Sequence, residues 1–592
     1  MKSIYKIRMM VAAGFMLAAT SCSDFSDYNS VPDDMQPSSN QTLWQNITSN
    51  GNLKDFAAIA KKAGYEKVFS LPNYYTVWAP LDGTYDAQSI LSKDSATIAD
   101  EFMQQHIAQY SHLVSGENTE RVVSLNDKVH NFSSNSYDDI EIEQANVASS
   151  NGVLHVLKGI SEFHPNLYQQ IDRLEGCNNF KDYIQKYDEY YLDPSASVIG
   201  PMVNGQQTYL DSVFKKRNNV IEKILNAKLE NEDSTYTMLV PNDAAWNLAY
   251  DEIKNNFNYL KSLTYMDMSL NSAAAASVSA TTGKCAKPEE IDNELYTDSL
   301  TKRFIVGNLL YSNTYDFNSP IWTGVQSSDK LDTLVTTTNT EITNIKDIYS
   351  HTVGETEKNS NGYTRVLDSL CYLPWETYQP VRTYRTPIRV LGLATGKSYA
   401  THNIIKSTLA SRDTLFEGVP EFIKKMMLPD DSQFLTYIST DKADLANTNT
   451  KSEIDIALKG LLSTKYHIFV VTAPAQLLEP ETEELKPMYL RFDLSYTDAT
   501  GAQKFQRLNK PGNKLSDDII TTPGKFTVIE MEFNMPICYY GLSKAYPTLF
   551  ISHTKAFTTA INRNKYDQEI RIVGVYLVPE QAYNYYKKIY NE

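Results

Sequence analysis

The sequence predicts a multidomain protein of mixed α+β and β class: two units that combine helices with strands, followed by a mainly antiparallel β part. Three observations support this prediction. The chain has 592 residues, which is too long for one ordinary hydrophobic core. One short phrase occurs twice, and beyond residue 376 helical periodicity gives way to alternating segments. The apolar share of 42% and the charged share of 21% are typical of globular proteins.

The repeated phrase reads YYTVWAPLDGTYDA at residues 74–87 and YTMLVPNDAAWNLA at residues 236–249. The copies share four positions, which pair as Thr76 with Thr237, Pro80 with Pro241, Asp82 with Asp243 and Tyr85 with Trp246. Each proline pre-sets φ, and we expect each aspartate to accept hydrogen bonds from backbone N–H groups just downstream, at a turn or a helix N-cap. Contact with a ligand or a partner is the alternative role for the two aspartates.

The phrase belongs to a longer shared order of elements. In the first unit, helical spacing precedes it, a helical run over residues 98–114 follows it, and the strand motif at 151–160 closes the unit. In the second unit, the corresponding segments are 220–229, 301–315 and 361–370. The phrases are 161 residues apart and the closing motifs 210, so the second unit carries about 49 extra residues. The Ser/Ala/Thr-rich stretch 269–290 is expected to hold some of them as a surface loop.

This order resembles the fasciclin-like (FAS1) domain over residues 41–375. The first unit has Tyr110 and His112 where the family has an adjacent Tyr-His pair, and the second has Tyr311 without the histidine. The resemblance implies two tandem domains, 41–165 and 166–375, each a compact β-sandwich wedge flanked by helices, and an adhesive role. His155 in the closing motif, replaced by Arg365 in the second unit, is expected to be a hydrogen-bonded strand histidine rather than a ligand.

The pattern of residues 376–592 predicts an antiparallel, jelly-roll-like β-sandwich that one helix near 419–427 interrupts. Its strands are expected within 386–393, 465–474, 487–498, 525–535 and 569–579, where apolar and polar residues alternate between turn-rich stretches. Such sandwiches often bind carbohydrates or proteins, although a fold alone does not establish a function. Tyr or Trp side chains of this part would be the surface for stacking on sugar rings. No ligand-binding residue can be named from the sequence.

The N-terminus has the features of a targeting signal. A basic start and a short apolar run lead to the sequence ATSC, which resembles a bacterial lipoprotein lipobox with Ala19 in place of the usual leucine. The resemblance implies a signal peptide over 1–21, lipidation of Cys22 and a flexible tether over 22–40. Ser23 and Asp24 resemble the export signal of Bacteroidota surface lipoproteins, which implies the outer membrane, facing outward. An ordinary secretory signal is the alternative.

Several classes of chemistry are not expected. A formal charge of −16 without a basic patch argues against nucleic acid. The chain lacks the local motifs of nucleophile elbows, zinc proteases, phosphate loops and dinucleotide folds, so we predict no enzyme, no cofactor and no metal. Nine histidines leave open a triad that only the fold would assemble. Cys177, Cys285, Cys371 and Cys538 are scattered, and the sequence cannot choose among their three pairings.

The expected function is that of a non-catalytic surface lipoprotein used for binding or assembly. The resemblance to Bacteroidota lipoproteins implies an accessory of a TonB-dependent transporter and its lid lipoprotein, in the uptake of a glycan or peptide. Cell or matrix adhesion is the alternative, and an enzyme with two carboxylates about 5–10 Å apart is a third possibility. Six Asp-Ser/Thr-apolar triplets resemble O-glycosylation acceptors of Bacteroidota, with chance and helix capping as the other explanation; they begin at Asp94, Asp211, Asp298, Asp332, Asp368 and Asp413.

Overall fold

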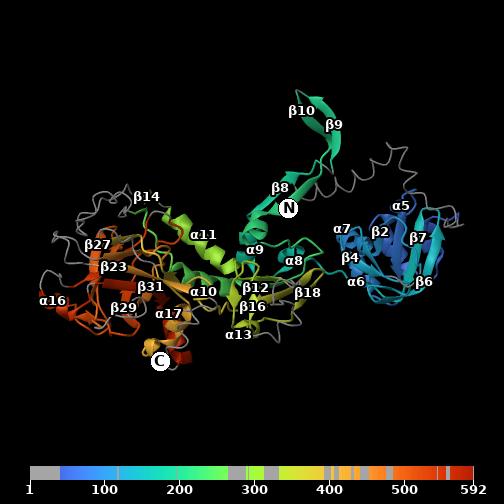
Figure 1. Cartoon of the computed structure of the whole chain (residues 1–592). Coiled ribbons are helices and arrows are strands. Elements are labelled where there is room, and N and C mark those ends of the chain that lie inside the picture. The colour runs from blue at the N-terminus through green and yellow to red at the C-terminus, as the bar shows by residue number, and fades with distance from the viewer. Residues whose placement is uncertain are drawn as a thin grey trace. The chain divides into compact units, whose positions relative to one another are not determined.

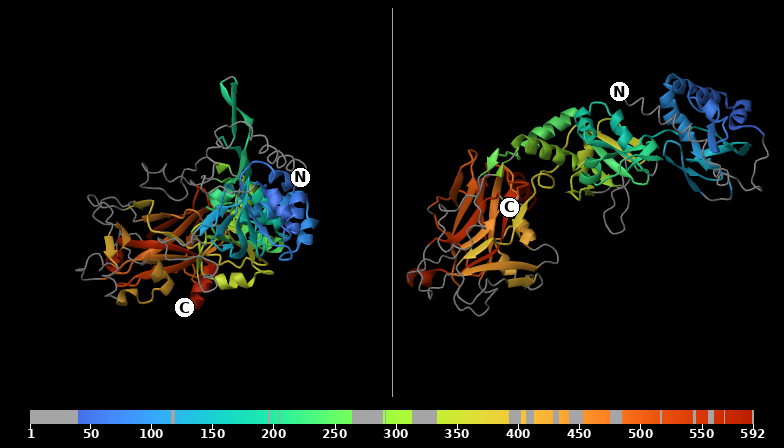
Figure 2. Two further views of the ribbon diagram at one scale, coloured as in Figure 1. Left: turned by 90° about the vertical axis from the view of Figure 1, so that its right-hand side faces the viewer. Right: turned by 90° about the horizontal axis from the view of Figure 1, so that it is seen from above.

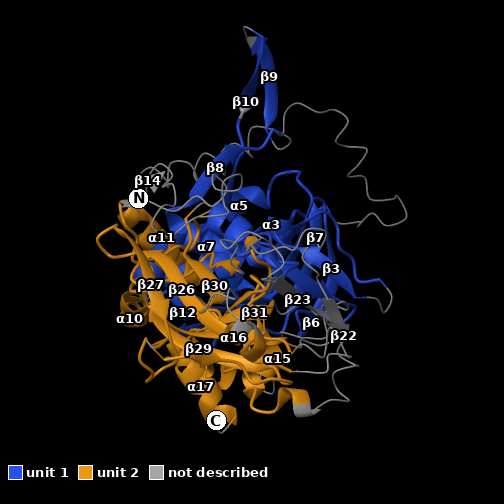
Figure 3. Ribbon diagram, turned by 60° about the vertical axis from the view of Figure 1, so that its left-hand side comes forward, with its two compact units in different colours: residues 1–240, 310–327, 354–366 blue, residues 241–309, 328–353, 367–592 orange. Residues whose placement is uncertain are grey.

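The computed structural model describes residues 40–590 except 116–118, 195–196, 204, 264–288, 291, 313–332, 392–401, 406–412, 428–432, 441–452, 475–484, 516, 543–544, 555–559 and 568. The chain forms two compact units (Figure 3). Unit 1 holds residues 1–240, 310–327 and 354–366, and unit 2 holds 241–309, 328–353 and 367–592. None of the helices within the described ranges is long and apolar enough to cross a membrane.

The first module of unit 1 is a seven-stranded sheet with short helices (Figure 1). The strand order is β2-β1-β7-β6-β5-β4-β3, and β1 runs parallel to β7. The strands are β1 (Tyr75–Pro80), β2 (Ile107–Gln109), β3 (Glu120–Val123), β4 (Val129–Phe132), β5 (Ser136–Tyr137), β6 (Ile140–Ser149) and β7 (Gly152–Leu157). The helical segments are α3 (Leu43–Ser49), α4 (Lys54–Lys62), α5 (Tyr65–Val68), α6 (Ala87–Ser92), α7 (Ser95–Ile98), η2 (Ala99–Met103) and η3 (Gln104–His106).

The first copy of the repeated phrase forms β1, the second strand from one edge of the sheet, which is buried on both faces. Val77 and Ala79 pack into the core that the helices cover, whereas Trp78 packs on the opposite face against Phe132 and Tyr137. Trp78 is 0% exposed, which explains why apolar residues occupy both faces of this strand from Val77 to Ala79.

The helix predicted over 98–114 is too long. The helical segment ends at His106, and β2 then pairs antiparallel with the phrase in β1. Tyr110, with φ of 67°, ends this strand in the left-handed region. The second module, which is the second repeat predicted over residues 166–375, departs from the prediction in the same way. Its helix α11 (Asn293–Val306) ends before β15 (Leu310–Ser312), and β15 pairs with the second copy of the phrase in β12 (Tyr236–Pro241). In each of the two segments predicted as one helix, the C-terminal part is therefore a short strand.

The duplication extends further than the phrase. In the four-stranded sheet β15-β12-β19-β18, β12 lies beside β19 (Gly362–Leu367), as β1 lies beside β7, and β18 (Glu357–Asn359) pairs with β19. Asn151 before β7 accepts from the Leu43 N–H at 2.8 Å, and Asn361 before β19 accepts from the Leu167 N–H at 2.8 Å. Each asparagine also donates to two carbonyls of its own module. One buried amide thus closes each module.

The helices α8 (Leu167–Arg173) and α9 (Asn178–Gln185) are the counterparts of α3 and α4. The N-caps Thr42 and Asn166 both form capping boxes with a glutamine, and both pairs of helices stand 124 residues apart in the chain. The prediction of a helix over residues 220–229, as the counterpart of the helical segments before the first copy of the phrase, is therefore wrong. Residues Val220–Ile224 form only a π-helical turn, η4.

A β ribbon between α9 and η4 accounts for most of the added length before the second phrase. It consists of β8 (Asp188–Leu192) paired with β11 (Phe214–Asn218), and β9 (Val198–Val203) paired with β10 (Gln206–Asp211). The ribbon extends away from the rest of unit 1, as the left view of Figure 2 shows in green. Its second half exposes Ile199, Met202 and Leu210 by 66%, 68% and 75%.

Unit 2 begins with helices and ends with two six-stranded sheets. Its first elements are α10 (Asp243–Lys254), β13 (Ser262–Leu263), β14 (Glu289–Glu290), α11, β16 (Leu334–Val335), β17 (Glu341–Ile342) and α13 (Ile345–Ser350). One sheet, called the β25 sheet, contains β22 (His402–Ile405), β23 (Gln433–Thr440), β31 (Glu569–Pro579), β25 (Lys465–Thr472) and β29 (Thr527–Asn534), with β20 (Arg382–Tyr384) beside β31. Helices α15 (Glu421–Met427) and α17 (Glu580–Tyr590) pack against it; η7 (Asp413–Phe416) and α16 (Ala560–Lys565) complete the helical segments.

The second sheet, called the β26 sheet, has one apolar face and one polar face. It contains β21 (Arg389–Leu391), β24 (Glu453–Ala457), β30 (Thr548–His553), β26 (Tyr489–Thr497) and β27 (Gln503–Leu508), with β28 (Ile519–Ile520) beside β26. Ile454, Phe492 and Ile551 are 0% exposed on the apolar face. The mixed α/β class with several sheets is confirmed, whereas the jelly-roll-like sandwich stays a prediction.

Candidate functional site

The two aspartates of the repeated phrase, Asp82 and Asp243, both lie at the N-terminus of a helix. The Asp82 carboxylate accepts from the N–H groups of Lys54 and Asp55 at 2.9 Å each, at the start of α4. The prediction of a capping carboxylate was correct, but the N–H groups lie 27 and 28 residues upstream rather than just downstream. Asp243 lies in the first turn of α10, where its negative charge interacts favourably with the positive end of the helix dipole. The N-cap residue itself is its neighbour Asn242.

The Tyr-His element of the first module serves the same strand. The Thr76 hydroxyl donates to the Tyr110 carbonyl at 2.8 Å and accepts from the His112 N–H at 2.9 Å. His155 is 0% exposed, and its Nε2 lies 2.9 Å from the His112 carbonyl. Burial lowers the pKa of His155 to about 4, so its imidazole is neutral at neutral pH. The strand histidine that the sequence predicted is what the structure has.

Ser124, His130 and Asp138 have the order of contacts of a catalytic triad. His130 Nδ1 lies 2.5 Å from Asp138 Oδ2, and Nε2 lies 3.0 Å from Ser124 Oγ. However, Ser124 is only 4% exposed, and its hydroxyl donates to Asn126 Oδ1 at 2.5 Å. Burial would raise the pKa of Asp138, but hydrogen bonds from His130 and Ser161 hold it below its usual value. We interpret this set as a buried network, because a nucleophile must reach its substrate.

A group of buried charges lies on the polar face of the β26 sheet. Eight side chains define this face: Arg389, Glu453, Asp455, Arg491, Asp493, Phe505, Arg507 and Phe550. Their position follows from register, because Phe550 pairs with Asp455 on one side and with Asp493 on the other. Residues opposite one another in a sheet point to the same face, so the two aspartates lie two strands apart, about 10 Å between their backbones.

Each aspartate of the polar face is paired with an arginine. Arg491 Nε lies 2.5 Å from Asp493 Oδ2, and its Nη2 lies 3.1 Å from Oδ1, which gives a two-bond fork. Arg389 contacts Asp455 through Nε and lies 2.8 Å from Glu453 Oε1 through Nη2. Asp455 is 0% exposed and Asp493 is 5% exposed. Arg491 and Phe505, the latter 39% exposed, bring the face to solvent.

The pair at Asp455 is incompletely satisfied. Asp455 Oδ1 and Arg389 Nη1 are buried atoms without a hydrogen-bond partner in the described part of the chain. Burial, and next the charge of Glu453, raise the pKa of Asp455 above its usual value, although Arg389 acts in the opposite direction. Buried polar atoms are usually paired, and a buried acid with a displaced pKa is a common mark of a functional site. The face is therefore the leading candidate for a binding site.

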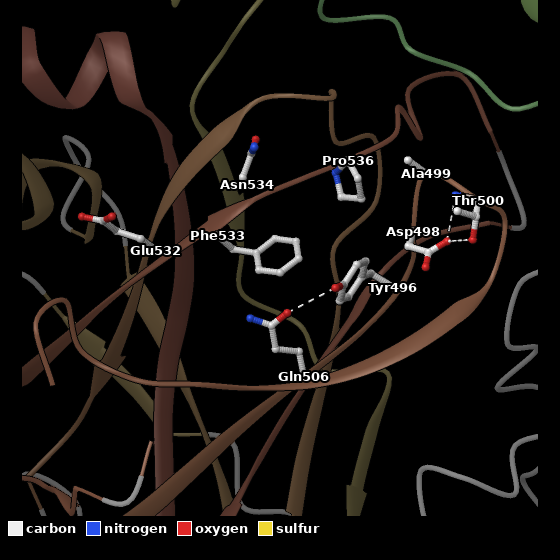
Figure 4. Close-up of a pocket in the computed structure, with 9 residues that line it drawn as sticks. All are labelled: Tyr496, Asp498, Ala499, Thr500, Gln506, Glu532, Phe533, Asn534 and Pro536. Carbon is white, nitrogen blue, oxygen red and sulfur yellow. Dashed lines mark hydrogen bonds between the residues drawn. The ribbon is translucent and has the colours of Figure 1, made fainter. Parts of the chain in front are cut away.

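A separate hollow of about 510 Å³ lies at the rim where β26 and β27 meet β29 (Figure 4). The Tyr496 ring lies against Phe533, with ring centroids 4.7 Å apart, and its hydroxyl bonds Gln506 at 3.2 Å. Asp498 accepts from the Thr500 hydroxyl at 2.6 Å, which with nearby backbone bonds lowers its pKa to about 2. Because these polar groups are satisfied within the chain, the hollow is the weaker candidate.

The sequence contained a signal for the polar face that the strand prediction did not use. Arg491, Asp493 and Ser495 alternate with three fully buried apolar residues, and Glu453 and Asp455 flank Ile454 in the same way. Charged residues on one face of an otherwise buried strand are unusual. What the sequence lacked was the order of the strands, which brings Arg389 and Phe550 beside these carboxylates.

The structure describes only some of the cysteines and Asp-Ser/Thr triplets that the sequence singled out. Cys22, Cys285 and Asp332 lie outside the described residues. No disulfide joins any two of the cysteines that the structure describes, which are Cys177, Cys371 and Cys538. Asp94 caps α7 by accepting from the Ala96 and Thr97 N–H groups, which agrees with the capping explanation for that Asp-Ser-apolar triplet. Asp298 lies within α11 and pairs with Lys302, and Asp368 pairs with His351.

Comparison with known proteins gives only weak likenesses to solved structures. No protein-family profile matches the chain, and no curated relative matches it. Among solved structures, a FAS1 domain pair from the insect cell adhesion molecule Fasciclin I is 14% identical, covering 55% of this chain and 99% of that chain at a TM-score of 0.19. A CBM22-1–GH10 portion of Clostridium thermocellum xylanase 10B is 10% identical, with 34% and 28% covered and a TM-score of 0.18. The CBM22-2 xylan-binding domain from Paenibacillus barcinonensis Xyn10C is 11% identical, with 25% and 80% covered and a TM-score of 0.16.

At TM-scores of 0.19 or less, these likenesses carry no argument about the fold or the function of this chain. The duplication within the chain rests on its own strand order and on Asn151 and Asn361.

Proposed function

We propose that the protein is a non-catalytic binding protein whose β26 and β25 sheets form a carbohydrate-binding sandwich. The single observation that carries the proposal is the polar face, where the exposed Arg491 and Phe505 side chains lie on the same side of the sheet as the buried Arg389–Asp455 pair. A ligand hydroxyl can accept from the Arg491 guanidinium while the sugar ring packs on Phe505, because these two side chains of the face reach solvent. In the proposal, Cys22 carries a lipid anchor in the outer membrane, and the chain is an accessory of a TonB-dependent nutrient transporter.

The composition of the polar face favours a neutral, hydroxyl-rich ligand. Three arginines face three acidic side chains, one of which, Asp455, is favoured in its neutral form by burial, so the face has little excess charge to attract an ion. Phe505 and Phe550, with ring centroids 5.5 Å apart, add an apolar surface of the kind that packs against a sugar ring. Both aspartates are paired with guanidinium groups, which supports binding rather than proton transfer to a leaving group.

A glycan array, followed by titration of the full chain with the best glycan, tests the proposal. We expect one class of glycan to bind, and Phe505→Ala to weaken its binding about fivefold, because loss of a stacking ring costs about 1 kcal/mol. Phe214→Ala is the matched control, since Phe214 is an even more exposed phenylalanine, on the ribbon. An array on which nothing binds, or equal affinities for both variants and the native chain, would reject the proposal.

Adhesion is the second candidate, and the β ribbon of unit 1 is the observation that favours it. A lone two-stranded ribbon is marginally stable in water, and this one exposes Ile199, Met202 and Leu210. Contiguous exposed apolar side chains mark protein-contact surfaces. Contact of the ribbon with another protein would cover these side chains.

Changing Ile199, Met202 and Leu210 together to glutamine separates the two candidates. We expect the triple variant to lose most attachment of protein-coated beads to cells or matrix, while glycan affinity stays unchanged. Leu248→Gln is the control, because Leu248 is 69% exposed on α10, outside the ribbon. Equal attachment by the triple variant and the control would eliminate adhesion through the ribbon.

A further inference from the structure

A cluster of three different metal-ligating side chains lies in unit 2, apart from the polar face. Asp347 and His351 are four residues apart, at α13 and its C-cap, and Cys371 lies in the segment after β19. One ligand atom from each of the three lies within 4.8 Å of the others. Positions four apart share one side of a helix, which brings the carboxylate and the imidazole together.

The cluster is held in place by bonds outside the three side chains. His351 Nδ1 lies 2.9 Å from Asp368 Oδ1, and the Asp368 N–H donates to the His351 carbonyl at 3.1 Å. The Asn344 side chain donates to the Cys371 carbonyl at 2.8 Å, which fixes the cysteine beside the start of α13. A carboxylate that holds the imidazole of a ligating histidine is the usual outer support of a metal site. Asp368 occupies that place.

We propose that Asp347, His351 and Cys371 bind one zinc ion, with water as the fourth ligand and Asp368 as the carboxylate that orients His351. Thiolate, imidazole and carboxylate are the three protein ligand types of zinc, and a thiolate disfavours magnesium and calcium. Binding forms a Zn–S bond and releases the thiol proton of Cys371 to solvent. The ion would join α13 to the segment after β19.

Zinc binding by the full chain tests the proposal. The chain is first freed of metal with a chelator and then given Zn²⁺ or Co²⁺. We expect one equivalent of Zn²⁺ to stay bound through gel filtration, and bound Co²⁺ to give the near-ultraviolet absorption of cobalt–thiolate bonds. Cys371→Ser is expected to abolish that absorption, and His351→Gln to weaken zinc binding at least tenfold. Asp368→Asn is expected to weaken it less than His351→Gln does.

Two control variants locate the ion. His112→Gln removes a histidine that has the same contact of Nδ1 with a carboxylate, at 2.8 Å from Glu120, but is not part of either described three-ligand cluster. His467→Gln removes the other three-ligand cluster, with Glu530 and Glu532. Both variants should bind zinc as the native chain does. Absence of bound zinc, a missing cobalt–thiolate absorption, or loss of zinc in His467→Gln but not in His351→Gln would overturn the proposal.

Discussion

Glu232→Ala is expected to destabilise unit 1 by about 3–5 kcal/mol, the cost of leaving a buried charge without its partner. Lys128 Nζ lies 2.7 Å from Glu232 Oε1 and 3.0 Å from both Gln169 Oε1 and Ser360 Oγ. The side chains of Lys128 and Glu232 are only 4% and 10% exposed. Burial lowers the pKa of Lys128, and the charge of Glu232 partly counteracts this lowering. Because Glu232→Ala removes that charge, the variant also favours the neutral amine of Lys128.

Hydrogen exchange in β3 and β4 during urea titration would measure this loss in unit 1 of the full chain. The matched control is Glu189→Ala, which breaks the pair with Arg217 where both side chains are about half exposed, and which should cost far less than Glu232→Ala. Lys128→Met together with Glu232→Leu should recover most of the stability, because replacing both charges leaves none unpaired. A similar small cost for Glu232→Ala and Glu189→Ala would contradict the account of this pair.

Gly152→Ala and Gly362→Ala are each expected to cost about 3 kcal/mol or more, because a Cβ has no room at either position. At Gly152 it would lie 2.1 Å from the Tyr75 carbonyl oxygen, and at Gly362 it would lie 1.9 Å from the Tyr236 carbonyl oxygen. Both oxygens belong to the first residue of the repeated phrase in its strand. The two glycines are thus equivalent in the duplication.

The same exchange measurement, applied to β7 and β19, would detect both losses. Gly51→Ala is the matched control, since nothing lies within 4 Å of a Cβ there, and it should change stability by less than about 1 kcal/mol. If Gly152→Ala destabilised its module and Gly362→Ala did not, the two closing motifs would not be equivalent as described.

The duplicated phrase was readable from the sequence because its residues serve local structure. Thr76, Pro80 and Asp82 act within one module, and the strand that closes each module follows its Asn-Gly pair directly. The helices α8 and α9 were missed because the ribbon inserted after them changes the spacing from 124 to 161 residues. A search for one constant spacing could not detect both parts of the repeat.

Residues that depend on distant segments were not predictable. Lys128 and Glu232 are 104 residues apart, and Asp455 contacts Arg389 across 66 residues, so neither partner could be chosen from 55 basic and 71 acidic residues. The strands β25, β26, β29 and β31 were predictable, because their apolar residues belong to one chain segment each. Their order in the two sheets, which creates the polar face, is a tertiary property.

Hydrogen exchange of the full chain, with and without the glycan that binds best on the array, tests the central claim most directly. The account predicts slower exchange in β24, β26 and β30, the strands that carry Asp455, Asp493 and Phe550, and unchanged exchange in β1 and β7 of the first module. Slower exchange confined to the first module or to the ribbon, or no change in any strand, would contradict carbohydrate binding on the polar face.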